Sequence, residues 1–254
     1  MTELSTILNG RPRPTGQSAA DPPVALPSVL IATRHGESTA NVEFQLAEAT
    51  GALEVPIGCR DADIPLSIHG QTQAQALGRW WAELPSADRP RAVWCSPYLR
   101  TTETARIAIA QAAGLGAVPV GLPVRYDERL RDRELGILEM LTAAAIDKRH
   151  PEEAARRRKM GELYYRPPGG ESWADVALRV RDCLRDVCAE EAGHPVLLVG
   201  HDNVVLMLRY VLERLDEQRL LALSPVRNCS TSVWRATEGR LRPELWNGTG
   251  HLGA

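Results

Sequence analysis

Short apolar runs alternate along this chain with longer segments in which apolar residues recur every three or four positions. A short apolar run is typical of a strand buried on both faces, whereas the longer spacing is typical of an amphipathic helix. The predicted strands cover residues 29–33, 92–96, 124–126, 196–200 and 231–236. The predicted helices cover residues 69–83, 98–112, 173–191 and 203–214. Because strands separated by helices form parallel sheets with helices on both faces, the pattern predicts an α/β fold with a mainly parallel central sheet.

Three segments do not follow this alternation. Residues 1–27 are rich in Pro, Ser, Thr and Gly without periodicity, which predicts a disordered tail ahead of a single domain over residues 28–254. Residues 43–63 and 141–168 are polar and long for loops. We expect these two insertions to form a lid over one end of the sheet.

Composition narrows the class of protein. A chain of 254 residues can bury a full core, and its net charge of −2 gives no sign of a nucleic-acid or membrane partner. No apolar run reaches the length of a transmembrane helix, and the first residues lack the pattern of a signal peptide. The five cysteines include no pair at CxxC spacing, so we interpret them as reduced thiols of a cytoplasmic protein.

Polar residues follow the predicted strands at their carboxyl ends. Arg34 and His35 directly follow the first strand, and His201 follows the fourth. Arg100 lies in the first turn of the helix after the second strand, and Asp132 lies in a loop after the third. Because ligands of open α/β sheets bind at the carboxyl ends of the strands, we expect these side chains to gather at one edge.

These residue types suit the transfer of a phosphoryl group to histidine. Neutral imidazole is a good nucleophile near pH 7, and the planar guanidinium of arginine can hold two phosphate oxygens. A metal site is a weaker interpretation, because the chain contains neither HExxH nor CxxC spacing. A phosphate-binding P-loop and a dinucleotide fingerprint are also absent from the sequence, so we expect no metal and no cofactor.

With these residues assembled, the chain resembles the histidine phosphatase superfamily, also called the phosphoglycerate mutase-like family. Residues 34–41 (RHGESTAN) are similar to the opening RHGxSxxN of that family. Further blocks follow in the order of the family: DIPLSIHG at 63–70, SPYLRTTET at 96–104, RLRDRELG at 129–136 and PGGES at 168–172. The resemblance covers about residues 28–238 and implies the phosphoglycerate mutase-like α/β fold.

The resemblance also implies a role for each position. His35 is the nucleophile that becomes phosphohistidine. Arg34, Arg100 and His201 form the pocket that neutralises the phosphoryl group during transfer, and Asn41 adds a neutral donor to the same oxygens. Charge on the phosphoryl oxygens is then stabilised by fixed cationic donors, without a metal.

Two positions depart from the pattern of the family. Its general acid, a glutamate, aligns with Asp132, whose side chain is one methylene shorter; Glu134 and Glu128 remain alternative acids. His201 is followed by Asp202, where many relatives carry glycine. Three interpretations of Asp202 stay open: it raises the pKa of a neighbouring histidine, it caps the following helix, or it binds an amine or hydroxyl of the substrate.

The function that the resemblance implies is metal-independent hydrolysis of a small phosphorylated metabolite. A cofactor-dependent phosphoglycerate mutase is the first alternative; mutases of this family carry a longer insertion after the acid, with basic residues that close on the substrate. The segment from Asp132 to His201 spans 69 positions, a length closer to that of the phosphatases of the family. Arg156 and Arg157, in contrast, are basic residues of the kind that favours a mutase. A catalytically silent phosphate-binding protein is disfavoured, because a decayed site would be expected to lack at least one of four residues that are all present here: Arg34, His35, Arg100 and His201. We expect a homodimer as a starting assumption.

Overall fold

The computed structural model describes residues 25–119 and 121–253. The predicted tail over residues 1–27 therefore lies largely outside the described residues. At its end Leu26 packs against the core, and its carbonyl oxygen accepts a hydrogen bond from the Gly193 amide at 2.8 Å.

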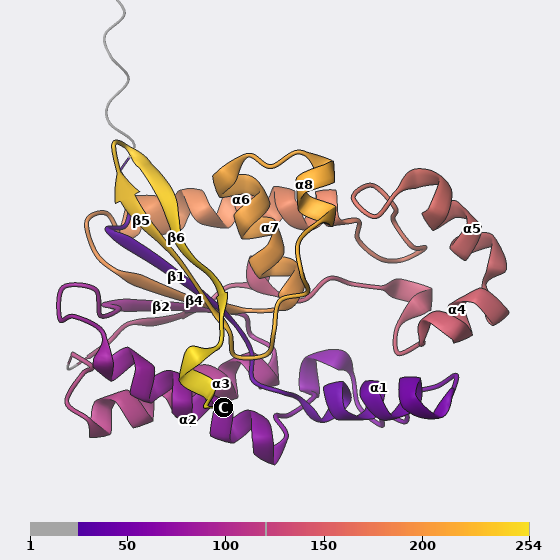
Figure 1. Ribbon diagram of the computed structural model, residues 1–254, viewed down its shortest axis with the longest axis horizontal. Coiled ribbons are helices and arrows are strands. Elements are labelled where there is room, and N and C mark those ends of the chain that lie inside the picture. Colours follow the sequence, from indigo (N-terminus) through magenta and orange to yellow (C-terminus); the bar gives the residue numbers. More distant parts are fainter. Residues whose placement is uncertain (1–24, 120, 254) are drawn as a thin grey trace, which may run out of the picture.

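A six-stranded sheet forms the centre of the described part of the chain, in the order β3-β2-β4-β1-β5-β6 (Figure 1). The first four strands of this order are parallel, whereas β5 runs antiparallel to β1 and β6 antiparallel to β5. The bounds are β1 (Val29–Arg34), β2 (Ala92–Cys95), β3 (Val124–Tyr126), β4 (Val196–Gly200), β5 (Thr231–Thr237) and β6 (Arg240–Gly248). The predicted mainly parallel sheet is confirmed.

Helices cover both faces of this sheet (Figure 1). Along β1, Val29 and Ile31 pack with residues of α2 and α3, whereas Leu30 and Ala32 pack with residues of α6 and α7. This alternation follows from the two-residue period of a strand. The bounds are α1 (Thr39–Thr50), α2 (Ile68–Glu83), α3 (Leu99–Gly114), α4 (Ala143–Arg149), α5 (Pro151–Met160), α6 (Trp173–Glu190), α7 (Asp202–Glu213) and α8 (Glu217–Leu221).

The two insertions contain helices that the pattern did not predict. α1 begins at a capping box made by Ser38 and Asn41 and ends at Gly51, whose φ is 70°. Only Ala40 and Ala47 of α1 are buried, so the helix has no apolar stripe that would mark it in the sequence. α4 and α5 belong to the second insertion, and α1, α4 and α5 all lie beyond the same end of the sheet (Figure 1).

Strand β6 and helix α8 were also missed. Only Leu241 of β6 is buried, and Pro243 interrupts its pattern. Such a strand pairs because β5 offers a free edge, and not because its own sequence alternates clearly. α8 has five residues, too few for a periodic signal.

The topology brings the ends of β1 and β4 together. These strands are neighbours, and the His35 amide, just past β1, donates to the carbonyl oxygen of Gly200 at 2.9 Å. After β1 the chain passes through α1 before it reaches α2 on one face, and after β4 it enters α7 on the other (Figure 1). An open α/β sheet has its ligand crevice where successive connections leave toward opposite faces. No helix in the described ranges combines the length and the apolar character needed to cross a bilayer.

Candidate active site

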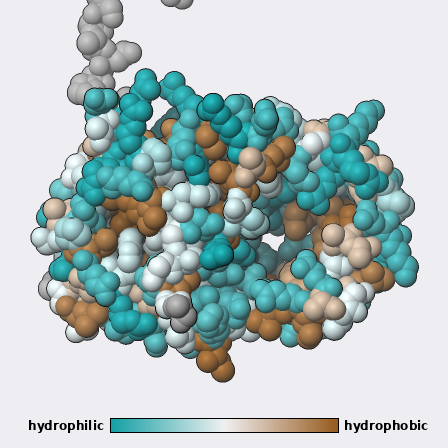
Figure 2. Space-filling model, viewed as in Figure 1, coloured by the Kyte–Doolittle hydropathy of each residue, from teal (hydrophilic) through white to brown (hydrophobic). Residues whose placement is uncertain are grey.

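A cavity of about 200 Å³ opens at the carboxyl edge of the sheet, and we call it the pocket. Among the residues that line it are five of the predicted site residues: Arg34, His35, Asn41, Arg100 and Asp132. The sixth, His201, is fully buried beside them, with its ring centroid 5.2 Å from that of His35. In the space-filling view the surface is hollowed between the sheet region and the arm formed by α4 and α5 (Figure 2).

His35 presents one defined nitrogen to the pocket. Its Nδ1 lies 2.7 Å from the carbonyl oxygen of Gly36, which can only accept a hydrogen bond. Nδ1 therefore carries the proton, and Nε2 keeps its lone pair. Burial, together with the positive charges of Arg34 and Arg100, holds the pKa of His35 well below 6.5. The ring is thus a neutral nucleophile at neutral pH.

The backbone around His35 is held from three directions. Its carbonyl oxygen accepts hydrogen bonds from the Cys229 amide at 3.0 Å and from Asn228 Nδ2 at 3.2 Å. The next amide, that of Gly36, donates to Thr104 Oγ1 at 3.0 Å. Sequence reasoning missed Asn228, because it lies 193 residues from His35 and belongs to no recognised block.

Two glycines allow the loop after β1 to contact α2. A Cβ atom on Gly36 would lie 2.5 Å from the carbonyl oxygen of Gly70, and one on Gly70 would lie 2.0 Å from that of Glu37. Side chains at these positions would push the two backbone segments apart. Glycine at position 36 thus serves a backbone contact within the protein.

Arg34 and Asn41 each have a donor that the protein itself does not use. Arg34 Nη1 donates to the carbonyl oxygen of Val226 at 2.7 Å, while its buried Nε has no partner among the described residues. Asn41 Oδ1 accepts from the Ser38 amide and from Asn228 Nδ2, both at 3.0 Å, so Nδ2 is the end of the amide that can donate to a ligand. A buried donor without a partner is rare, and the buried Arg34 Nε therefore indicates an anion as the missing acceptor.

Arg100 lies almost entirely buried between two carboxylates. Its Nη2 donates to Asp61 Oδ2 at 2.9 Å and to Asp132 Oδ2 at 3.0 Å. Its Nη1 donates to the backbone oxygen of Asp61 at 2.5 Å. Sequence reasoning placed Asp61 in the predicted lid over residues 43–63 and gave this residue no role of its own, whereas the structure makes it a partner of Arg100.

Asp132 and His201 form a pair behind the pocket. His201 Nδ1 lies 3.2 Å from Asp132 Oδ2, and Nε2 lies 2.9 Å from Ser96 Oγ. Burial lowers the pKa of His201, and the attraction of Asp132 offsets only part of this. Burial alone would raise the pKa of Asp132, but the attraction of His201 and Arg100 outweighs it and holds the pKa well below 3.8. Before substrate binds, Asp132 is therefore a carboxylate and His201 is neutral at pH 7.

Residues 30–249 match the family model described as the histidine phosphatase superfamily (branch 1). The chain belongs to this superfamily. Its resemblance to the family, seen first in the ordered blocks, is thereby confirmed.

Individual relatives in the superfamily have different activities. The chain is 30% identical over 242 residues to glucosyl-3-phosphoglycerate phosphatase of Mycobacterium tuberculosis. This match covers 88% of the chain and 96% of the relative. It is 31% identical over 195 residues to 2,3-bisphosphoglycerate-dependent phosphoglycerate mutase 2 of Gloeobacter violaceus, at 76% and 79% coverage. A solved structure of mycobacterial glucosyl-3-phosphoglycerate phosphatase with VO3 superposes with a TM-score of 0.68 at 29% identity, covering 87% of this chain and all of that one. Phosphatases and mutases thus both occur among the similar proteins.

The structure separates the alternative acids. Glu134 Oε1 accepts from the Tyr98 hydroxyl at 3.1 Å and does not line the pocket, and Glu128 is exposed. Glu139, which sequence reasoning missed, does line it. Burial, followed by the negative charges of Asp61, Glu134 and Asp132, raises the pKa of Glu139 to about 7. Glu139 belongs to no motif that the sequence reveals. The short turn Gly136–Leu138 before it determines where its side chain lies, and that position is known only from the structure.

Asp202 is the first residue of α7 and not its N-cap, which is His201 without a side-chain cap hydrogen bond. Asp202 Oδ1 accepts a hydrogen bond from the Asn203 amide at 2.7 Å, one of the free donors in the first turn of α7. Asp202 also lines the pocket, so it remains available to a substrate. Among the described residues no group of three or more His, Cys, Asp and Glu side chains is placed to hold a metal ion.

Proposed function

We propose that this member of the histidine phosphatase superfamily hydrolyses phosphomonoesters of a small metabolite through a phosphohistidine at Nε2 of His35. The observation that carries the proposal is the 2.7 Å contact of His35 Nδ1 with the carbonyl oxygen of Gly36. It leaves Nε2 unprotonated in a side chain that lines the pocket with Arg34 and Arg100. A phosphohistidine requires this tautomer, because the attacking nitrogen must hold a lone pair.

In the first step Nε2 of His35 bonds to phosphorus as the bond to the alkoxide oxygen breaks. Negative charge on the three remaining phosphoryl oxygens is met by Arg34 Nε and Asn41 Nδ2, which have no acceptor among the described residues, and by the nearby positive charge of Arg100, whose Nη2 is shared with Asp61 and Asp132. Fixed donors of this kind stabilise the transition state without reorganising. The arginines supply the positive charge, so the proposed reaction uses no metal and no cofactor.

The leaving alkoxide needs a proton, which we assign to Asp132. Its carboxylate is ionised at rest because Arg100 and His201 attract it. A bound phosphate dianion competes for Arg100 and repels the carboxylate, and both effects raise the pKa of Asp132. Asp132 then protonates the alkoxide, and as a carboxylate it removes a proton from the water that attacks phosphohistidine.

The residues that favoured a mutase do not reach the pocket. Arg156 lies 3.3 Å from Glu153 and Arg157 lies 2.5 Å from Glu162, and neither arginine lines the pocket. We therefore favour hydrolysis over mutase activity. The silent binding protein is also disfavoured, because the nucleophile and its cationic neighbours are present together. A cytoplasmic location and a homodimer stay predictions.

The first test replaces the nucleophile. Because the phosphoryl group then has no acceptor, His35→Ala should lower phosphate release from nitrophenyl phosphate by about 1,000-fold or more. Its circular dichroism and melting curve should remain those of a folded protein. The control is His194→Ala, which removes an exposed ring at the opposite end of β4 and should retain full activity.

A trapping experiment reads the intermediate itself. Labelled substrate quenched in alkali should leave label on His35 of the unaltered protein and none on His35→Ala. Interconversion of 3- and 2-phosphoglycerate, primed with the bisphosphate, should be absent. Normal turnover by folded His35→Ala would refute the mechanism, and fast interconversion with little phosphate release would identify a mutase.

A further inference from the structure

The pocket contains more carboxylates than the proposed chemistry uses. Asp61, Asp132, Glu139 and Asp202 all line it. Asp61 and Asp132 are both paired with Arg100. Glu139 and Asp202 form no ion pair with any described residue: Glu139 Oε2 lies 3.4 Å from the Leu135 amide, and Asp202 Oδ1 accepts from Asn203. We call Glu139 and Asp202 the acidic wall.

None of the arginines that line the pocket is paired with the acidic wall. Arg100 is paired with Asp61 and Asp132 and must share its donors with a bound phosphoryl group, and Arg34 has a free Nε beside His35. The third lining arginine, Arg133, donates to the carbonyl oxygens of Glu171 at 2.7 Å and Tyr165 at 3.3 Å. These carbonyl contacts orient Arg133 and leave its charge in place, but none of the three arginines forms an ion pair with Glu139 or Asp202.

The absence of a paired cation also affects the ionisation of Glu139. Burial first, and then the charges of Asp61, Glu134 and Asp132, raise its pKa to about 7. A carboxyl group titrates so high only where no cation compensates for burial and neighbouring negative charge. A second anion placed here would meet the same unfavourable environment.

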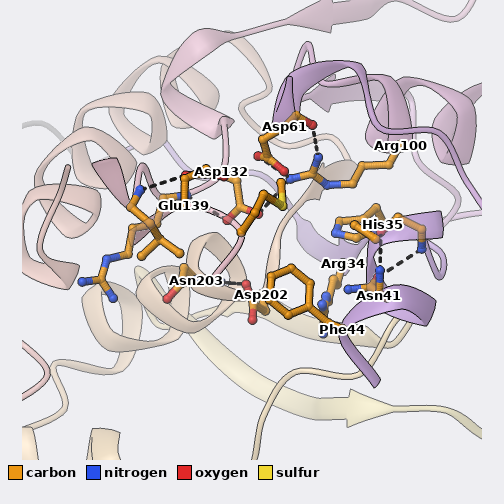
Figure 3. Close-up of a pocket in the computed structure, with 15 residues that line it drawn as sticks. Arg34, His35, Asn41, Phe44, Asp61, Arg100, Asp132, Glu139, Asp202 and Asn203 are labelled. Carbon is orange, nitrogen blue, oxygen red and sulfur yellow. Dashed lines mark hydrogen bonds and ion pairs between the residues drawn. The ribbon is translucent and has the colours of Figure 1, made fainter. Parts of the chain in front are cut away.

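The remaining lining residues suit an uncharged molecule. Phe44, Leu135 and Met140 provide apolar contact, and Asn203 adds an amide. In the close-up, the labelled Asp132 and Glu139 lie across the pocket from His35, Arg34 and Asn41, and Phe44 and Asp202 lie between the two groups in this view (Figure 3). Apolar surface with a few acceptor oxygens binds molecules that present hydrogen-bond donors on a carbon skeleton.

We propose that the acidic wall selects phosphomonoesters whose alcohol carries hydroxyl or ammonium groups and no second negative charge. Glu139 and Asp202 would accept hydrogen bonds from those groups, while Arg34 and Arg100 hold the phosphoryl group. The inference rests on the proposed function, since it concerns the leaving-group side of the same pocket. It excludes phosphoglycerates as good substrates, because their carboxylate would lie beside unpaired carboxylates.

The test uses pairs of substrates that differ mainly in charge. Glycerol 3-phosphate is compared with 3-phosphoglycerate, and phosphoethanolamine with phosphoglycolate, at pH 8, where Glu139 is ionised. We expect kcat/KM to favour the first member of each pair by about tenfold or more. In the double variant Glu139→Gln with Asp202→Asn, this ratio should fall toward one.

The control for the double variant is Glu48→Gln, which removes an exposed carboxylate of α1 that does not line the pocket. Its ratios should equal those of the unaltered protein. A ratio that favours the anionic substrates, or one that the double variant leaves unchanged, would overturn the acidic wall as the selecting element. Hydrolysis of nitrophenyl phosphate would then still support the proposed function.

A binding measurement separates the two proposals if no substrate turns over. Failure to hydrolyse any phosphomonoester, including nitrophenyl phosphate, would refute the proposed function. Dissociation constants of the same four compounds, measured by calorimetry on His35→Ala, report charge preference without chemistry. Weaker binding of the two carboxylates supports the inference, and equal or tighter binding of them overturns it.

Discussion

At His35 a single hydrogen bond determines which nitrogen can react. The Gly36 carbonyl oxygen fixes the proton on Nδ1, and burial beside two arginines keeps the ring neutral. The same arginines that bind an anion therefore also prevent protonation of the nucleophile. The two arginines thus attract the phosphoryl group and also keep His35 neutral, because a cation and a protonated imidazole repel each other.

The protonation of His35 can be observed directly. Its pKa lies below 6.5, so the neutral ring should persist as pH falls past that value, with Arg34, Arg100, His201 and Asp132 as the charged or titratable neighbours. We expect nitrogen NMR at pH 6 to show His35 as a neutral imidazole, with its signal absent in His35→Ala. A His35 ring protonated at pH 6 would contradict this.

Asp132 is tested by the leaving group. Because Asp132 is assigned to protonate the alkoxide, Asp132→Asn should lower kcat/KM for an alkyl phosphate by about 100-fold or more. For nitrophenyl phosphate, whose leaving group hardly needs an acid, the loss should be much smaller. Parallel kinetics on Glu48→Gln, which removes an exposed carboxylate that does not line the pocket, form the matched control. Equal losses on both substrates in Asp132→Asn would transfer the role of acid to another carboxyl group.

At the scale of elements, the loop after β1 is positioned by its contact with α2. The backbones at Gly36 and Gly70 approach so closely that neither position has room for a Cβ atom. Ser67 Oγ donates to Glu37 Oε1 at 2.6 Å and accepts from the Gly70 amide at 2.9 Å, which fixes the start of α2 against the same loop. The site thus depends on α2, although α2 contributes none of the lining residues.

A pair of glycine substitutions tests this contact. In Gly70→Ala the new Cβ would lie 2.0 Å from the Glu37 carbonyl oxygen, so backbone must move. We expect a loss of about 2 kcal/mol in the free energy of unfolding, measured in urea. Gly114→Ala, near the end of α3, meets open space and should be neutral or slightly stabilising. Equal stability of the two variants would show that the contact is not tight.

At the scale of the molecule, the pocket joins segments that are distant along the chain. Arg34 and Asn41 come from β1 and α1, Arg100 from α3, and Asp202 from the start of α7. An anion that bridges these segments stabilises the folded state, because the unfolded chain cannot hold the same donors together.

Orthovanadate provides the corresponding measurement. At about 100 times its dissociation constant, a ligand adds about 2.7 kcal/mol to stability, which for a chain of this size raises the melting temperature by about 5–10 °C. Arg34→Met should lose most of this rise, since it removes the guanidinium with its unpartnered Nε, whereas His194→Ala should retain it. An unchanged melting temperature in the unaltered protein would contradict an anion site.

The sequence by itself determined the sheet with its covering helices and the chemistry of its edge. Short apolar runs predict buried strands, and Arg34, His35 and His201 directly follow such runs. It did not reveal α1, α4, α5 or β6, because these elements expose most of their residues and depend on caps and neighbours.

Only the tertiary structure decided which carboxylates matter. Asp61 and Glu139 have no local signal, yet folding places both at the pocket, while Glu134 is directed to Tyr98. The ionisation of these groups also belongs to the fold, since burial and neighbouring charge set a pKa and neither is encoded locally. Spacing along a chain predicts which residues meet at a sheet edge, but electrostatic interactions depend on distances that only the packed molecule defines.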